Sequence, residues 1–174
     1  MTTFEVIEAR RYHCGAMARI MRPEQRHVLI AAGLNPHRVL SEGFAASWPC
    51  RAWLIDGRLA GLGGFVGQLL SRGEFVWLAL SEEASRHPVA VVREACRQLA
   101  ARGGEVTTSV AIDDHGALRL AASLGFHVSH DGPGRRAISR EDRAALISAV
   151  RQNIDKRITV GRTDYAVMGW RQWA

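Results

Sequence analysis

The stretch DDHGALRLAASLGF (residues 113–126) decides how the rest of this 174-residue chain is interpreted. Asp113 or Asp114 can cap the N-terminus of a helix, because a carboxylate accepts hydrogen bonds from the first free backbone N–H groups. Gly125 ends that helix, since glycine enters the left-handed conformation of a C′ residue without steric cost. Phe126 then opens a strand, FHVSH, so the stretch predicts a tight helix-to-strand exit. The inward face of the helix is expected to carry Leu118, Ala121 and Ala122.

The segments before this stretch predict five strands, because they are rich in branched and aromatic residues. They are FEVIEAR (4–10), RAWLID (51–56), LAGLGGFVG (59–67), GEFVWLAL (73–80) and EVTTSVAI (105–112). Asp56-Gly57 between the second and third runs is a strong hairpin signal. The glycines at 61, 63 and 64 lie inside a strand and lack a following Lys-Ser/Thr, so we interpret them as a bulge or a close backbone approach rather than a phosphate loop.

Helical periodicity is expected in three other regions. Residues 12–47 predict two or three short helices, with Pro23 and Pro36 in first-turn positions, where a missing N–H costs little. Residues 85–102 predict one helix, whose inward face is expected to comprise Val89, Val92, Cys96 and Leu99. A basic helix at about 139–156 precedes a last strand at 164–170, and its apolar positions are Leu146, Ile147, Val150 and Ile154.

This order of elements indicates the fold class. One strand, several helices and three strands are followed by alternating helices and strands, which predicts an α/β fold with a mixed central sheet flanked by helices in three layers. The length is that of one domain, so residues 1–174 are expected to form a single domain with the basic helix inserted before the last strand.

The composition leaves the choice of partners open. Residues 135–174 hold 9 basic and 4 acidic side chains, and so carry five of the six net positive charges. Such an excess can attract DNA or an acidic protein surface, but it is more often the mark of a solvated helix face and of a bias toward solubility. The three cysteines are scattered, without a CxxC pair, which predicts reduced thiols in the cytoplasm. No stretch of about 18 apolar residues occurs, so no membrane span is expected.

The helix–Gly-Phe–strand pattern resembles the GNAT acyltransferases, whose late helix typically reads Asn-x-x-Ala-x-x-Leu-Tyr-x-x-x-Gly-Phe. Aligned on Gly125-Phe126, this chain has Asp114, Ala117 and Leu120 for the first three positions and Ala121 for the tyrosine. The resemblance implies a GNAT-like fold, an acetyl-CoA cofactor and N-acetyl transfer. In the family that tyrosine commonly protonates the departing thiolate, which alanine cannot do.

A second GNAT motif, Arg/Gln-x-x-Gly-x-Gly/Ala, falls on the segment from Ser85 to Ala90, where both glycines are missing and Pro88 removes an N–H. Its backbone N–H groups would bind the cofactor pyrophosphate at a helix N-terminus, with Arg86 and His87 supplying positive charge. The cofactor-binding residues that the resemblance implies are Leu78, Ala79, Leu80, Arg86, His87, Val89, Ala90 and Asp114. Residues 107–109 would line the same slot.

Taken together, the glycine-rich strand, GEFVWLAL, the glycine-free helix start and DDHGALRLAASLGF look like the acetyltransferase-like internal virion proteins of short-tailed phages. That resemblance implies a structural or assembly role in a virion, with a degenerate acetyl-CoA site. Its partners would be other virion proteins, further copies of itself, or DNA bound by the basic C-terminal quarter. The alternative is an active acetyl-CoA-dependent N-acetyltransferase of unknown acceptor.

Two side chains are weighed as catalytic groups. Glu74 could deprotonate an amine through water if it faced the cleft, or it could be an exposed charge at a strand end. His115 could act from the first turn of the late helix, where a neutral imidazole is favoured. His127, His130 and Asp131 are not expected to share a metal, because strand residues three apart point to opposite faces.

Overall fold

The computed structural model describes residues 2–67, 74–102, 104–111, 114–128, 157–160 and 163–171; for 128, 157–160 and 163–171 it describes the backbone alone. The first half of the chain holds β1 (Phe4–Glu8), α1 (Arg11–Ile20), α2 (Pro23–Ala31), α3 (Pro36–Ala46), β2 (Cys50–Ile55), β3 (Arg58–Gly67) and β4 (Glu74–Leu80). The second half holds α4 (Glu82–Arg86), α5 (Pro88–Ala100), β5 (Glu105–Ala111), α6 (His115–Ser123), β6 (His127–Val128), β7 (Arg157–Val160) and β8 (Thr163–Arg171).

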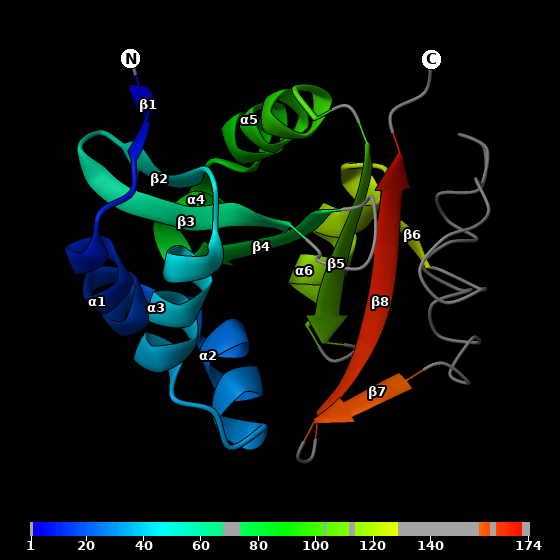
Figure 1. Cartoon of the computed structure of the whole chain (residues 1–174). Helices are drawn as coiled ribbons and strands as arrows, with labels where there is room; N and C mark the ends of the chain where they lie inside the picture. The colour runs from blue at the N-terminus through cyan, green and yellow to red at the C-terminus, as the bar shows by residue number, and fades with distance from the viewer. Residues whose placement is uncertain are drawn as a thin grey trace.

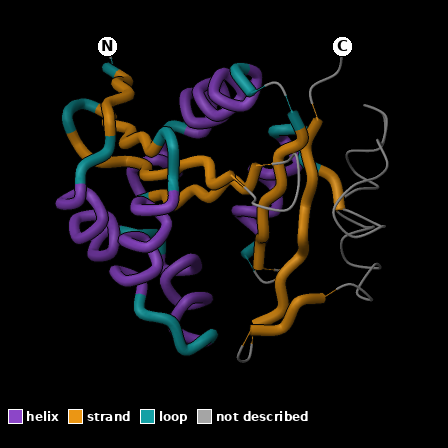
Figure 2. Tube along the Cα trace, viewed as in Figure 1, coloured by secondary structure: helices purple, strands orange, loops and turns teal. Residues whose placement is uncertain are grey.

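The strands form one mixed sheet in the order β1-β2-β3-β4-β5-β8-β6, with β7 paired to β8 (Figures 1 and 2). Among the described pairings, all are antiparallel except that of β4 with β5. Helices α1 and α3 pack on one face of β2–β4 through Met17, Leu40 and Leu62. Helix α5 packs on the other face through Val91 and Ala95. The predicted three-layer α/β fold is confirmed.

The hairpin between β2 and β3 forms where Asp56-Gly57 predicts it. Asp56 has φ 48° and Gly57 has φ 74°, and Ile55 pairs with Arg58 across the turn. Two successive positive φ angles are those of a type I′ turn, whose twist matches that of the flanking strands.

The N-terminal helices also begin where the prolines predict. Pro23 and Pro36 each stand in the first turn of a helix, α2 and α3 respectively. The Asn35 side chain caps α3 by accepting a hydrogen bond from the backbone N–H of Arg38, at 3.1 Å. The region 12–47 therefore forms three helices.

The helix predicted over 85–102 is present as α5, but its predicted N-terminal boundary is wrong. The segment after β4 forms the short helix α4, and α5 begins only at Pro88 because His87 leaves helical geometry at φ −126° and ψ 52°. The predicted inward face is confirmed at Leu99, which is buried, and Val92 is half-buried. It is wrong at Val89, which is 70% exposed, and at Cys96, which is exposed. The buried positions are Val91, Glu94, Ala95 and Leu99. Small apolar residues occur on both faces of this segment, so periodicity alone could not select the packed one.

Helix α6 ends as the opening stretch predicts. Gly125 has φ +89°, and its N–H donates to the carbonyl of Ala122 at 3.1 Å. The N–H of Phe126 donates to the carbonyl of Ala121 at 3.0 Å, and the Phe126 side chain is only 3% exposed. This pair of bonds is a Schellman motif, with Phe126 as the apolar anchor of the exit.

The C-terminal prediction is confirmed in part. The last strand is present as β8, which pairs with β5 from Glu105↔Arg171 to Ala111↔Tyr165. The sequence interpretation missed β7, which pairs with the start of β8. The predicted basic helix at about 139–156 lies outside the described residues.

The three cysteines are free, as predicted; Cys14 and Cys50 are buried and Cys96 is exposed. Burial raises the pKa of Cys50 to about 12, and the neighbouring Cys14 adds to the shift. The pKa of Cys14 is raised as well, mainly by burial. Both inner thiols are therefore protonated at neutral pH and act as small apolar groups in the core.

The predicted close backbone approach at the glycines of β3 is confirmed at Gly63. A Cβ atom built on this residue would lie 2.6 Å from the carbonyl oxygen of Trp77, in the neighbouring strand β4. That atom belongs to the backbone and cannot rotate away. Gly67, in the same strand, has nothing within 4 Å of a built Cβ.

The variant Gly63→Ala is expected to lower the free energy of unfolding by about 1–3 kcal/mol, because β4 must shift to accept the methyl group. Urea unfolding followed by circular dichroism measures this. Gly67→Ala is the matched control and should be neutral or slightly stabilising. Equal unfolding free energies for the two variants would contradict the close approach.

A buried ion pair joins the start of α2 to the start of α6. Arg22 Nη2 lies 2.7 Å from Asp114 Oδ1, and the two side chains are 12% and 4% exposed. The same carboxylate oxygen accepts from the N–H of Ala117 at 2.9 Å, so Asp114 also caps α6, as predicted. This one side chain therefore connects segments that are 92 residues apart.

Asp114→Ala is expected to lower the free energy of unfolding by about 3 kcal/mol, because it leaves Arg22 buried without its main partner. Asp114→Asn should cost less, since the amide oxygen still caps the helix. The exposed pair Arg38–Glu42, at 2.7 Å, supplies the control Glu42→Ala, which should change the free energy by about 1 kcal/mol or less. Equal losses in Asp114→Ala and Glu42→Ala would contradict a structural role for the buried pair.

Candidate functional site

The candidate site arises where β4 and β5 separate. Among the described residues they pair in parallel at only two positions, Glu74↔Val106 and Phe75↔Thr107. Beyond them a cavity of about 250 Å³ opens between the two strands. The separated edges carry backbone N–H and C=O groups that a normal sheet would pair, so this is a place where an extended ligand can add to the sheet.

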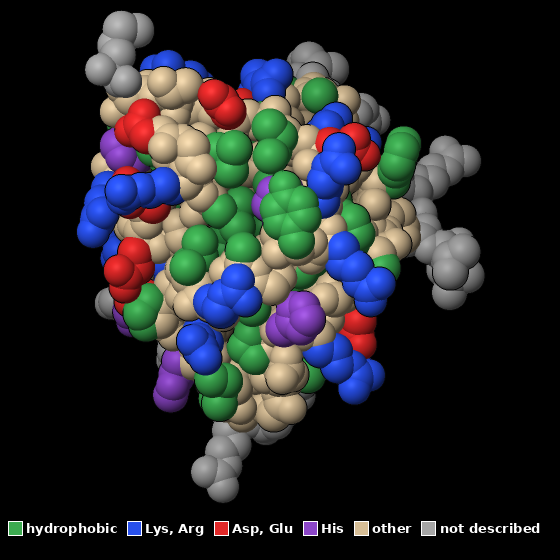
Figure 3. All heavy atoms as spheres, turned by 90° about the vertical axis from the view of Figure 1, so that its left-hand side faces the viewer, with side chains coloured by type: hydrophobic (Ala, Val, Ile, Leu, Met, Phe, Trp, Pro, Cys, Tyr) green, Lys and Arg blue, Asp and Glu red, His purple; other side chains and the backbone are tan. Residues whose placement is uncertain are grey.

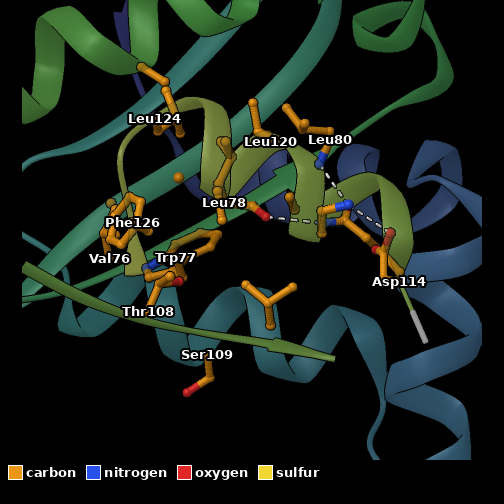
Figure 4. Close-up of a pocket in the computed structure, with 18 of the residues that line it drawn as sticks. Val76, Trp77, Leu78, Leu80, Thr108, Ser109, Asp114, Leu120, Leu124 and Phe126 are labelled. Carbon is orange, nitrogen blue, oxygen red and sulfur yellow. Dashed lines mark hydrogen bonds between the residues drawn. The ribbon is translucent and has the colours of Figure 1, made fainter. Parts of the chain in front are cut away.

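The walls of the cavity are mainly apolar and come from several elements (Figure 4). Strand β4 supplies Val76 and Leu78, and helix α6 supplies Leu120 and Leu124. Helix α2 closes another side with Val28 and Leu29, together with the half-buried Gln25. The Ser109 side chain of β5 is exposed and points away from the other labelled side chains (Figure 4). A cavity of this kind favours an apolar, extended group and excludes water around it.

Four of the predicted cofactor-binding residues line this cavity: Leu78, Ala79, Leu80 and Asp114. They meet there because β4 and the N-terminus of α6 flank the gap between the strands. Of the segment 107–109, Thr108 and Ser109 also line it. Their role toward a cofactor stays a prediction.

The other four, Arg86, His87, Val89 and Ala90, are not among the cavity-lining residues. They follow one another where α4 ends and α5 begins. The Glu83 carboxylate lies 3.0 Å from Arg86 Nη1 and 3.6 Å from His87 Nε2. The sequence interpretation did not include this pairing, although helical spacing of three and four residues is the signal that would have found it.

The two predicted catalytic residues are not part of the cavity lining. Glu74 opens β4 where the strands are still paired, and its carboxylate lies 3.5 Å from Arg102 Nη1. The Arg102 guanidinium in turn stacks on the Phe65 ring, 4.3 Å from its centroid. His115 is exposed in the first turn of α6. Neither residue lines the cavity, and their catalytic roles stay predictions.

Ala121, which stands for the tyrosine of the GNAT motif, lines the cavity and is 6% exposed. A methyl group cannot exchange a proton, so at this position the wall offers no acid. The sequence interpretation did not foresee that α2 reaches the site through Gln25, and no motif in the sequence marks that residue.

The surface on the side of α1 and β1 mixes both signs of charge (Figure 3). Arginine, acidic and histidine side chains surround a group of apolar ones there. Within the described residues, no three His, Cys, Asp or Glu side chains gather closely enough to hold a metal ion. None of the helices in this part of the chain is long and apolar enough to span a membrane.

No protein-family profile matches the sequence, and no curated protein sequence matches it. Solved structures do match. The ribosomal-protein-S18-alanine N-acetyltransferase from Escherichia coli has a TM-score of 0.58 at 15% identity, covering 99% of this chain and 97% of that one. A GNAT superfamily phosphinothricin acetyltransferase from Sinorhizobium meliloti, solved in complex with AcCoA, has a TM-score of 0.60 at 14% identity, covering 97% and 88%.

A GNAT family acetyltransferase from Bacillus anthracis has a TM-score of 0.57 at 9% identity, covering 97% of this chain and 94% of that one. Identities this low establish the architecture and nothing finer. The chain has the fold of the GNAT acetyltransferases.

Proposed function

We propose that this chain is an acetyl-CoA-dependent N-acetyltransferase. The observation that carries the proposal is the separation of β4 from β5 after two paired positions, with an apolar cavity along the exposed edge of β4. An extended arm bearing amides can pair with that edge, while its thioester end lies in a water-poor space. The GNAT fold of the chain supports this choice.

In the proposed reaction, an amine nitrogen of the acceptor attacks the thioester carbonyl carbon. The C–N bond forms, the C–S bond breaks, and the sulfur leaves as a thiolate that takes up a proton while the amine loses one. Since Ala121 lines the cavity where the motif has tyrosine, water takes up the proton of the amine and gives one to the thiolate. The chain's own contribution is to hold the arm extended and to keep the cavity apolar.

The phosphate end of the ligand fits less well than the arm. Arg86, His87 and the N–H groups of Val89 and Ala90 would have to meet the pyrophosphate at the start of α5. Glu83 already pairs with the two cationic candidates and places negative charge among them. Binding there requires Arg86, whose side chain is 68% exposed, to turn from Glu83 to the phosphates.

The interpretation as a virion structural or assembly protein has no support from the matched structures, which are acetyltransferases. Binding to DNA, to virion proteins or to further copies of this chain also stays a prediction. The segment that would carry the basic contact lies mostly outside the described residues. The acyltransferase proposal is therefore the one that the described site favours.

Acetyl-CoA and coenzyme A are expected to bind with micromolar Kd in isothermal titration calorimetry. Thr108→Trp should weaken binding by tenfold or more, on the order of 1.4 kcal/mol, because the indole fills the space between the strands. Ser123→Trp, an exposed position on α6 that does not line the cavity, is the control and should leave Kd unchanged. No heat and no thermal shift at millimolar ligand would remove the basis of the proposal.

Glu83→Gln is expected to tighten coenzyme A binding about fivefold at low salt, because it removes a negative charge from the proposed phosphate site and releases Arg86. The gain should shrink as ionic strength rises. Pantetheine, which carries the arm without phosphates, is the matched control ligand, and its affinity should not change. An equal gain for pantetheine would show that Glu83 acts elsewhere than on the phosphates.

A further inference from the structure

The side chain of Gln25 hydrogen-bonds to the exposed edge of β4. Its Nε2 donates to the carbonyl oxygen of Leu78 at 3.2 Å, and its Oε1 accepts from the N–H of Leu80 at 2.9 Å (Figure 4 draws both bonds). Gln25 belongs to α2, whose Leu29 also packs against the core cluster on β2–β4. A single primary amide therefore occupies one acceptor and one donor of the strand.

These two backbone groups belong to the edge that faces the cavity. Along a strand, the N–H and C=O groups of successive residues point to alternate sides, so those of Val76, Leu78 and Leu80 point to the same side. The carbonyl of Leu80 is taken as well, by the N–H of Arg22 at 2.9 Å. The connection from α1 to α2 and the Gln25 amide thus pair with β4 just where β5 has left it.

We propose that Gln25 is an internal competitor for the ligand-binding edge of β4, and that an acyl-CoA displaces its side chain on binding. The inference rests on the proposed function. The pantetheine arm of coenzyme A carries two amides in succession. When the arm is extended, the N–H of one and the C=O of the next can point to the same side. They offer the same donor and acceptor that Gln25 offers to Leu78 and Leu80.

Release of Gln25 requires no rearrangement of the core. Helix α2 has no buried residue, and the glutamine can leave the strand by rotation about its own side-chain bonds. The backbone contact of Arg22 and its ion pair with Asp114 hold the N-terminus of α2 in place meanwhile. Because two hydrogen bonds must be exchanged before the ligand pairs with β4, the competition lowers the apparent affinity, by about tenfold.

Gln25→Met tests the proposal, because methionine keeps the length of the side chain and removes both hydrogen bonds. The Kd for coenzyme A should fall about tenfold in titration calorimetry. His27→Met is the matched control, since His27 is an exposed residue of the same helix and does not line the cavity. Its Kd should equal that of the unaltered chain. Thermal melting confirms that both variants are folded.

Amide exchange at Leu80, measured by NMR, supplies a second readout. In the ligand-free state the exchange should be faster in Gln25→Met than in the unaltered chain, and coenzyme A should slow it in both. A Kd that is unchanged or higher in Gln25→Met overturns the competition and leaves the cofactor site standing. Binding to Gln25→Met alone supports both proposals, whereas binding to neither protein overturns both.

Discussion

The parallel pairing of β4 with β5 over two positions is the constraint on which the site depends. A parallel seam normally continues along the strands, since each added pair satisfies further backbone groups. Here it stops at Phe75↔Thr107, and each strand turns to other partners. Strand β4 keeps β3 on one side, and β5 keeps β8. The sheet thus remains continuous while leaving a gap that has strand edges as its walls.

The gap between β4 and β5 is kept open by the packing of α6 and α2 around it. The Schellman exit of α6 places Phe126 in the core beside Val110 and Ala121, so that helix packs against β5 at one side of the gap. The ion pair of Arg22 with Asp114 ties the N-terminus of the same helix to the start of α2. Two helices that are far apart in the sequence, α2 and α6, therefore line one cavity. The small side chain of Ala121 fits this packing and leaves the wall without a proton donor.

Local stereochemistry explains which parts of the fold could be predicted from the sequence. Asp56-Gly57, Pro23, Pro36 and Gly125 each demand a particular backbone geometry, and the structure has it at each position. The face of α5 could not be predicted, because Val89 and Val91 are equally apolar and only the sheet beneath selects one. The contribution of α2 to the site could not be predicted from the sequence for a similar reason. Gln25 meets Leu78 and Leu80 through a tertiary contact across more than fifty residues, which no local pattern encodes.

The two halves of the sheet also differ in when they can form. Strands β1 to β4 pair with neighbours through antiparallel contacts, β2 and β3 through a two-residue turn, so much of this half can assemble as the chain leaves the ribosome. The antiparallel pairing of β5 can form only after β8 has been synthesised, because Glu105 pairs with Arg171. Closing so long a loop is entropically slow. During synthesis, the edge of β4 is therefore unpaired before β5 has gained its antiparallel partner. Gln25 precedes β4 in the sequence, so its side chain can already hydrogen-bond to that edge.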